Sequence, residues 1–152
     1  MNTAIYAQLS GNAGLTAMLG HDPATNGPAI YYDHRNEKSP QTLYPAIIFR
    51  ECVTSPRHGM DIAGDVYGVI QDEFYDFTVE QSALNSREAN AVTNILETMD
   101  PLLHMQQLVM GTPTKNFNYR CLRIPGGSPS IYDSTMKVWR GMYRYQMIMA
   151  HA

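Results

Sequence analysis

The sequence ends in a long stretch in which apolar and polar side chains alternate. Between Val138 and Met149, the apolar parity contains Trp139, Tyr143, Tyr145, Met147 and Met149, and the polar parity contains Arg140, Arg144 and Gln146. Successive side chains of a β-strand point to opposite faces of a sheet, so this pattern predicts a strand with one apolar and one polar face. At roughly 3.3 Å per residue the strand is about 40 Å long. Since a small sheet needs less, we expect the strand to bend or to extend beyond the sheet.

A second segment, Phe74–Gln81, alternates in the same way. Its apolar parity is Tyr75, Phe77 and Val79, and its polar parity is Asp76, Thr78 and Glu80. The stretch 46–53, which follows Pro45, is rich in β-branched and aromatic residues and predicts a further strand. Shorter strands are predicted at 30–32, 107–110 and 119–124. Alternation favours antiparallel pairing with one buried face.

Turn-forming residues mark the loops between these strands. The region 21–41 has three prolines and is predicted to be mostly loop, and Pro-Gly-Gly-Ser-Pro at 125–129 predicts another loop. A long loop is expected over 54–71, which contains Pro56 and three glycines. Its part 66–70 is too apolar for an ordinary solvated loop, which indicates a protruding hairpin arm.

Two regions have helical spacing. Apolar residues between Thr3 and Leu19 recur every three or four positions, and Gly11 and Gly14 divide them into two short helices, the second of which Ser10 or Asn12 could cap. A longer helix follows Asn85, which is in position to cap it. The buried stripe of that helix is Ala89, Val92, Leu96 and Met99. Pro101 predicts its end, because proline cannot continue the hydrogen-bond ladder.

These elements predict one α+β domain over residues 1–152. We expect a mainly antiparallel sheet of four to five strands, two helices packed on one face, and a protruding loop or hairpin arm.

Composition excludes several functional classes. Of 152 residues, 11 are Lys or Arg and 14 are Asp or Glu, which makes 16% charged, against roughly 25% in ordinary domains. A net charge of −3 gives no basic footprint for a nucleic-acid backbone. The longest apolar run, 44–49, is far below the roughly 20 residues of a membrane helix, and no secretory signal is visible. With two cysteines, Cys52 and Cys121, outside any metal-binding spacing, we expect reduced thiols and a protein that is intracellular or assembled inside a cell.

The motifs of catalytic and cofactor sites are absent. There is no phosphate-binding loop with a lysine, no nucleophile elbow and no closely spaced histidine pair. His58 and Asp61 could form a metal pair or an acid–base pair, but nothing nearby completes a coordination shell, so we interpret them as parts of a solvated loop tip. The sequence therefore predicts no catalytic, cofactor-binding or metal-binding residue.

Ten tyrosines and ten methionines are the remaining signal. Tyr and Met are enriched at the centres of protein interfaces, where Lys and Glu are depleted. The same residues also fill ordinary cores, and those of the last strand could pack against the helix at 89–99. Both interpretations stay open, although the long loop favours an interaction role. Low charge then suggests that the charge-poor faces become buried in an assembly.

The order of elements resembles a known family. The similar segments are Ile5–Leu9 with Ala13–Leu19, the strands Tyr44–Ile48 and Tyr75–Val79, the helix start Ser86–Ala89, and Tyr132-Asp133 followed by Arg140–Tyr145. Together they span nearly the whole chain and resemble the tail-completion, or tail-terminator, proteins of tailed bacteriophages, which join heads to tails. These motifs are soft patterns, and the regions 23–41 and 125–137 look longer than in a minimal member.

The resemblance implies assembly in place of catalysis. It implies a ring-forming subunit, typically hexameric, that can remain monomeric until it meets a tail tube. Its partners would be other copies of itself, the tail-tube protein and the head connector or stopper protein, with DNA only as cargo in the lumen and no membrane. The location implied is the head–tail junction of the virion, after assembly in the host cytoplasm.

Edge strands and protruding loops suit ring contacts, because their unpaired backbone groups can pair between subunits. The candidate contact residues are Arg57, Met60, Ile62, Val66 and Tyr67 on the long loop, and Arg140 and Arg144 on the polar face of the last strand. A weak net negative charge suits a channel that must not bind its DNA cargo.

Two alternatives belong to other functional classes. One is a small hydrolase-like enzyme whose site combines dispersed His, Asp and Cys residues, for example Cys52 with His58. The other is an adaptor or ligand-binding domain that acts as a monomer or dimer. An enzyme predicts a pocket where such residues converge, whereas a structural subunit predicts none.

Overall fold

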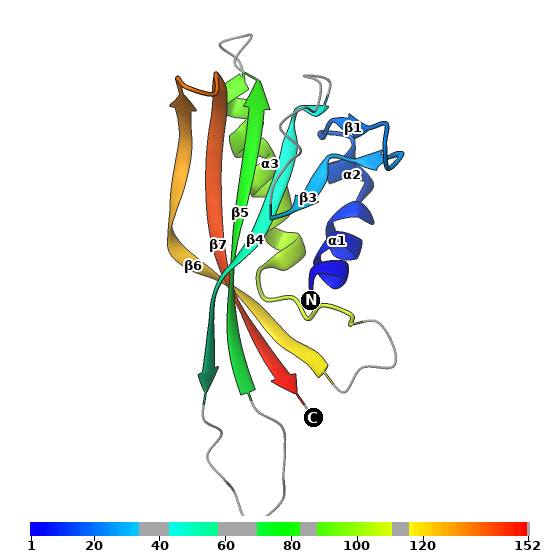
Figure 1. Ribbon diagram of the computed structural model, residues 1–152, viewed down its shortest axis with the longest axis vertical. Coiled ribbons are helices and arrows are strands. Elements are labelled where there is room, and N and C mark those ends of the chain that lie inside the picture. The colour runs from blue at the N-terminus through cyan, green and yellow to red at the C-terminus, as the bar shows by residue number, and fades with distance from the viewer. Residues whose placement is uncertain (34–42, 58–69, 83–87, 111–115, 152) are drawn as a thin grey trace, which may run out of the picture.

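A twisted five-stranded sheet forms the centre of the molecule (Figure 1). The computed structural model describes residues 1–33, 43–57, 70–82, 88–110 and 116–151. The strands are β3 (Ile30–Tyr32), β4 (Ala46–Arg57), β5 (Ile70–Ser82), β6 (Asn116–Asp133) and β7 (Val138–His151), in the spatial order β3-β4-β5-β7-β6. Every neighbouring pair is antiparallel except β3 and β4, which are parallel. The predicted α+β class with a mainly antiparallel sheet is confirmed.

Helices cover one face of this sheet (Figure 1). They are α1 (Asn2–Ser10), α2 (Ala13–Thr16) and α3 (Glu88–Leu103), and a small ribbon of β1 (His21–Asp22) and β2 (Gly27–Pro28) follows α2. The break between α1 and α2 is as predicted, and Asn12 caps α2 by accepting a hydrogen bond of 2.8 Å from the backbone N–H of Leu15. No helix in the described part of the chain is long and apolar enough to cross a membrane.

The core lies between the helices and the apolar parity of the strands. Phe77, on β5, is fully buried between Phe49 on β4 and Tyr145 on β7. Its ring stacks on Phe49 at a centroid distance of 5.6 Å and meets Tyr145 edge-on at 5.3 Å. Val92 and Met99 of α3, both buried, belong to the same cluster. The alternation that predicted one buried face therefore describes β5 and β7 correctly, and Tyr145, Met147 and Met149 are core residues.

The predicted loop at 54–71 is too long. Strand β4 continues to Arg57 and β5 begins at Ile70, so residues 54–57 and 70–71 are paired. A register shift between Glu51 and Val53 marks a bulge, which bends the hairpin as expected for an extra residue in one strand. Pro56 is tolerated because β3 pairs with β4 only as far as Phe49, which leaves Pro56 on an edge strand. The hairpin extends away from the helices (Figure 1), and residues 58–69 lie outside the described residues.

The predicted loop at 125–129 is wrong. These residues belong to β6, whose register against β7 shifts between Ile124 and Ser128 and again between Ser128 and Ile131. Gly126 adopts a φ of 108°, a conformation that residues with a Cβ rarely adopt. Prolines and bulges are compatible with an edge strand, and β6 is one. Pairing with the long strand β7 therefore keeps residues 125–129 in a strand, although their composition is typical of a turn.

The predicted end of α3 is also wrong, because the helix continues past Pro101 to Leu103. Leu103 is fully buried, and its burial offsets part of the roughly 3 kcal/mol that proline costs within a helix. The strand predicted at 107–110 is not formed. Instead, the backbone N–H of Met105 bonds to Cys121 O, and the N–H of Cys121 bonds to Gln106 O, along part of β6. The proposed cap Asn85 lies outside the described residues.

The two faces of β5 predict different costs for the same substitution. Phe77→Ala should lower the free energy of unfolding by about 3–5 kcal/mol, because it empties the centre of the core. Phe74→Ala, on the same strand but on the half-exposed opposite face, is the matched control and should cost clearly less. Urea unfolding of both variants measures the difference. Equal losses would contradict this assignment of faces.

Candidate assembly surface

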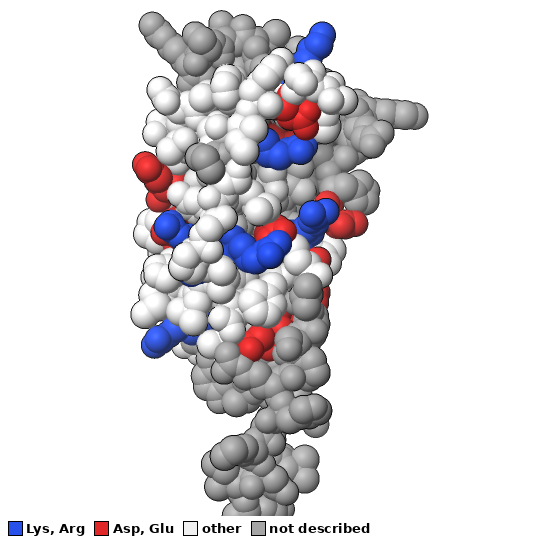
Figure 2. Space-filling model, turned by 90° about the vertical axis from the view of Figure 1, so that its left-hand side faces the viewer, with Lys and Arg blue, Asp and Glu red and all other residues white. Residues whose placement is uncertain are grey.

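The second face of the sheet is not covered by any described helix or strand. By register it carries the polar parity of the central strands, including Asp76, Thr78 and Glu80 of β5 opposite Arg144, Met142 and Arg140 of β7. Half-buried apolar residues lie between these groups, among them Ile48 and Phe74. Figure 2 shows the side of the molecule on which β6 and β7 lie, with basic and acidic side chains in small mixed groups and uncharged residues over much of the remaining described surface.

The strongest of these groups is a forked ion pair between β5 and β7. Arg144 Nε donates to Asp76 Oδ1 at 2.6 Å, and Arg144 Nη2 donates to Oδ2 at 2.8 Å. The Asp76 side chain is only 4% exposed, whereas that of Arg144 is 46% exposed and covers it. The hydrogen bonds from Arg144 lower the pKa of the Asp76 carboxyl, and Arg144 is in turn held more firmly in its charged form.

A second ion pair lies four residues away along both strands, on the same face of the sheet. Arg140 donates to Glu80 Oε1 from Nη2 at 2.6 Å and from Nε at 3.0 Å. Its Nη1 reaches Asp133 Oδ2 at 3.4 Å. Glu80, like Asp76, is almost fully buried beneath its arginine. Both arginines therefore carry their own counter-charges, which disfavours binding of this face to a nucleic-acid backbone.

The seven predicted contact residues have different positions. Arg140 and Arg144 lie together on the uncovered face, four residues apart on β7. Arg57 is the last residue of β4. Met60, Ile62, Val66 and Tyr67 lie outside the described residues. The role of all seven in contacts between subunits stays a prediction.

Sequence reasoning missed an apolar surface at the turn from β6 to β7. Ile131, Tyr132 and Met136 are 57%, 46% and 49% exposed, which makes them three of the six large hydrophobic residues exposed in the described part of the chain. The region 125–137 was interpreted as an extended loop. The sequence did contain a signal for this surface. Three large apolar residues lie within six positions of a predicted loop, and a solvated loop rarely contains so many.

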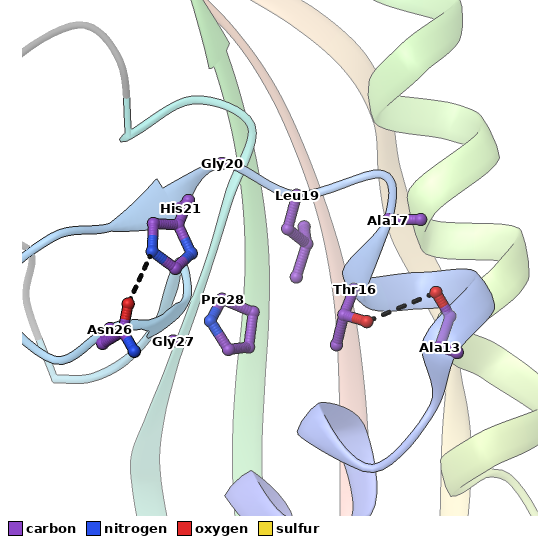
Figure 3. A pocket seen from close by; sticks show the side chains of 9 residues that line it. All are labelled: Ala13, Thr16, Ala17, Leu19, Gly20, His21, Asn26, Gly27 and Pro28. Carbon is purple, nitrogen blue, oxygen red and sulfur yellow. Dashed lines mark hydrogen bonds between the residues drawn. The ribbon is translucent and has the colours of Figure 1, made fainter.

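A shallow depression of about 340 Å³ lies beside α2 (Figure 3). Its lining residues are Ala13, Thr16, Ala17, Leu19, Gly20, His21, Asn26, Gly27 and Pro28. At its rim, His21 Nε2 and Asn26 Oδ1 are 3.2 Å apart and hydrogen-bonded. Figure 3 shows Leu19 and Pro28 between the β1–β2 ribbon and α2. None of the lining residues is acidic or a Lys or Arg.

The described residues do not assemble a nucleophile or a metal site. No group of three or more His, Cys, Asp and Glu side chains is placed to hold a metal ion within the part of the chain that the structure describes. Burial raises the pKa of the Cys121 thiol to about 12, and burial together with Asp76 raises that of Cys52. Both thiols are therefore protonated near neutral pH and are weak nucleophiles. His58, the partner considered for Cys52, lies outside the described residues.

No model of a protein family matches the sequence, and no curated protein matches it. A solved structure does match: a chain of the virion of a native gene transfer agent particle superimposes with a TM-score of 0.65 at 14% sequence identity. The match covers 99% of this chain and 94% of the other. The two chains share a fold. The overlap is nearly complete in both directions, so the shared fold extends over almost the whole of each chain.

The buried carboxylate of Asp76 predicts a pH-dependent stability. The pKa of Asp76 is lower in the folded state than in the unfolded state, where it is about 3.9. The pair with Arg144 therefore contributes its full stabilisation at pH values above about 3.9. That stabilisation is lost as the pH falls through the lower pKa of the folded state. Asp76→Asn should cost about 1–3 kcal/mol at pH 7. The difference in free energy of unfolding between the wild type and Asp76→Asn, measured with urea, should become smaller towards pH 2.

Glu97→Gln, which neutralises an exposed carboxylate on α3, serves as the control and should change stability by less than about 0.5 kcal/mol throughout. If Asp76→Asn lowers the free energy of unfolding by the same amount at every pH, the pair with Arg144 is not the cause of that loss.

Proposed function

We propose that this protein is a structural subunit of a phage-like particle that closes the end of a tail tube and joins it to the head. The observation that carries the proposal is the shared fold with a chain of a gene transfer agent virion, which extends over almost the full length of both chains. The order of elements that resembles the tail-completion proteins is an independent argument from the sequence for the same class.

The surface chemistry supports a role in assembly. The uncovered sheet face combines half-exposed apolar residues with arginines whose charges are already neutralised by Asp76 and Glu80. When such a face is covered, the buried carboxylates keep their arginine partners, which avoids the larger cost of an unpaired buried charge. The exposed apolar tip at Ile131, Tyr132 and Met136 is likewise typical of a contact surface.

In this proposal, copies of the chain form a ring, typically of six subunits, at the head–tail junction of the virion. One side of the ring contacts the tail-tube protein and the other contacts the head connector or stopper protein. DNA passes through the lumen as cargo. Paired arginines suit that passage, since they present little net positive charge to phosphate groups.

Removal of the gene tests this function directly. Cells that lack it should accumulate DNA-filled heads and separate, overlong tails, because nothing ends tube growth or presents a surface to the head. Electron microscopy of lysates measures both. Adding the purified chain to the separated parts should restore joined particles, and the same chain with an epitope tag should label only the junction.

A Phe77→Ala chain, which we expect to be unstable, is the control for the addition experiment. Normal joined particles without the gene, or labelling along the tail or over the head, would contradict the proposed function.

A further inference from the structure

The turn between β6 and β7 carries an exposed apolar knob, defined here as Ile131, Tyr132 and Met136. Asp133 fixes the turn, because its Oδ1 accepts the backbone N–H groups of Thr135 at 3.0 Å and of Met136 at 3.1 Å. Three further contacts hold the knob: the ring of Tyr132 lies 5.4 Å from that of Trp139, Arg140 Nη1 reaches Asp133 Oδ2, and Arg140 Nη2 reaches Met136 Sδ at 3.4 Å. A side chain that is already ordered loses less entropy when it binds, so the knob is prepared for a contact.

The depression beside α2 has complementary properties. Its lining contains no acidic residue, Lys or Arg and consists mainly of small and apolar residues, with His21 and Asn26 at the rim. Its base is fixed to the sheet, because the N–H of Gly20 bonds to Pro45 O at 2.7 Å and the N–H of Ala29 bonds to Gly20 O at 2.8 Å. At Gly20 a Cβ atom would lie 2.5 Å from the carbonyl carbon of Leu43, so this wall packs directly on the backbone. Such a preformed, neutral surface suits an apolar side chain without a free charge.

Strand register places the knob and the depression on opposite flanks of the sheet at the same height. One row of paired residues crosses the sheet from Ala46 through Glu80 and Arg140 to Ile131. The knob lies at the β6 end of that row. The depression lies at the other end, because Gly20 bonds to Pro45, the residue before Ala46. In Figure 1 the β6–β7 turn and the β1–α2 region accordingly lie on opposite sides of the upper part of the molecule.

We propose that the knob of one copy seats in the depression of the next copy, so that this contact closes the ring. The proposal rests on the function proposed above and names the two surfaces involved. The surfaces differ, so the contact is heterologous, and an open chain of copies still presents one free knob at one end and one free depression at the other. Because both lie at one height across the sheet, successive copies stand side by side and the contacts can return to the first copy. Strand pairing is a poor alternative at the β6 edge, where Pro125, Pro129 and the bulges interrupt the ladder.

Complementary defects test the contact. The knob variant carries Ile131→Asp and Met136→Asp, and the depression variant carries Ala17→Glu, so that the two damaged surfaces repel each other. Each variant alone should associate roughly tenfold or more weakly than the wild type, as expected when apolar anchors are lost. A mixture should form a one-to-one dimer and nothing larger, since each variant retains one intact surface. Native mass spectrometry measures these species. Larger assemblies from either variant or from the mixture, or a mixture without the dimer under conditions in which the wild type associates, would overturn the contact.

Cross-linking captures the same contact where the free protein stays monomeric. In a Cys52→Ser background, the pair Ala17→Cys with Ile131→Cys is treated with a short bis-maleimide at high concentration; Cys121 is buried. The expected products are a ladder of oligomers that ends at one closed size. Each single-cysteine variant should give no more than dimers. The control is the pair Ala17→Cys with Val109→Cys, because Val109 is the most exposed large apolar side chain among the described residues. This pair should give no ladder.

The outcomes separate this contact from the proposed function. If gene removal leaves heads and tails unjoined but the ladder is absent or equals that of the Val109 pair, the function stands and the contact is wrong. If the ladder closes but particles join normally without the gene, the contact stands and the function is wrong.

Discussion

The antiparallel pairing of β5 with β7 is the interaction on which the rest of the structure depends. It runs without a register shift from Ile70 opposite Ala150 to Ser82 opposite Val138. Because the register is uninterrupted, every side chain on these two strands has a fixed face. Phe77 and Tyr145 meet in the core, while Asp76 and Arg144 meet on the other side. A slip of β7 by one residue would turn Arg140 and Arg144 toward the helices while Asp76 and Glu80 stayed on the other face, so both ion pairs would break and the register is strongly specified.

The uncovered face has an unusual electrostatic structure for a surface. Its carboxylates, Asp76 and Glu80, are almost fully buried, and its arginines lie over them. An isolated buried carboxylate is costly, so these pairs are required by the fold whether or not the face contacts a partner. The consequence for function is a surface that is polar in composition but nearly neutral in charge. Where another protein covers these two pairs, Asp76 and Glu80 keep their partners.

The outer strands contrast with this regular centre. β3 pairs with β4 over three residues only, and β6 has two prolines and several register shifts. Part of the β6 edge is covered by the backbone of Met105 and Gln106. These features limit uncontrolled pairing between sheets. With strand pairing limited at both edges, side-chain surfaces such as the knob and the depression are the remaining candidates for contacts between copies.

Much of the fold could be predicted because its central strands alternate strictly. The faces of β5 and β7, the division of the N-terminal helix and the cap at Asn12 all depend on local spacing. The errors occurred where tertiary pairing outweighed local composition. Residues 125–129 look like a loop but are held in β6 by β7, and Pro101 looks like a helix end but burial of Leu103 continues the helix. Sequence reasoning selected Arg140 and Arg144 without their partners Glu80 and Asp76, and the role of this face in subunit contacts stays a prediction.

The amino-acid sequence by itself determined which residues of each central strand form the core, because a period of two leaves no other way to bury Tyr75, Phe77 and Val79 together. Its low charge predicts surfaces that are buried in an assembly, and this stays a prediction. Only the tertiary structure decided which acid neutralises which arginine, and that the knob and the depression lie at opposite ends of one row. Both depend on strand order and register, which join residues such as Ala46 and Ile131 across 85 positions of the chain by contacts that no local pattern encodes.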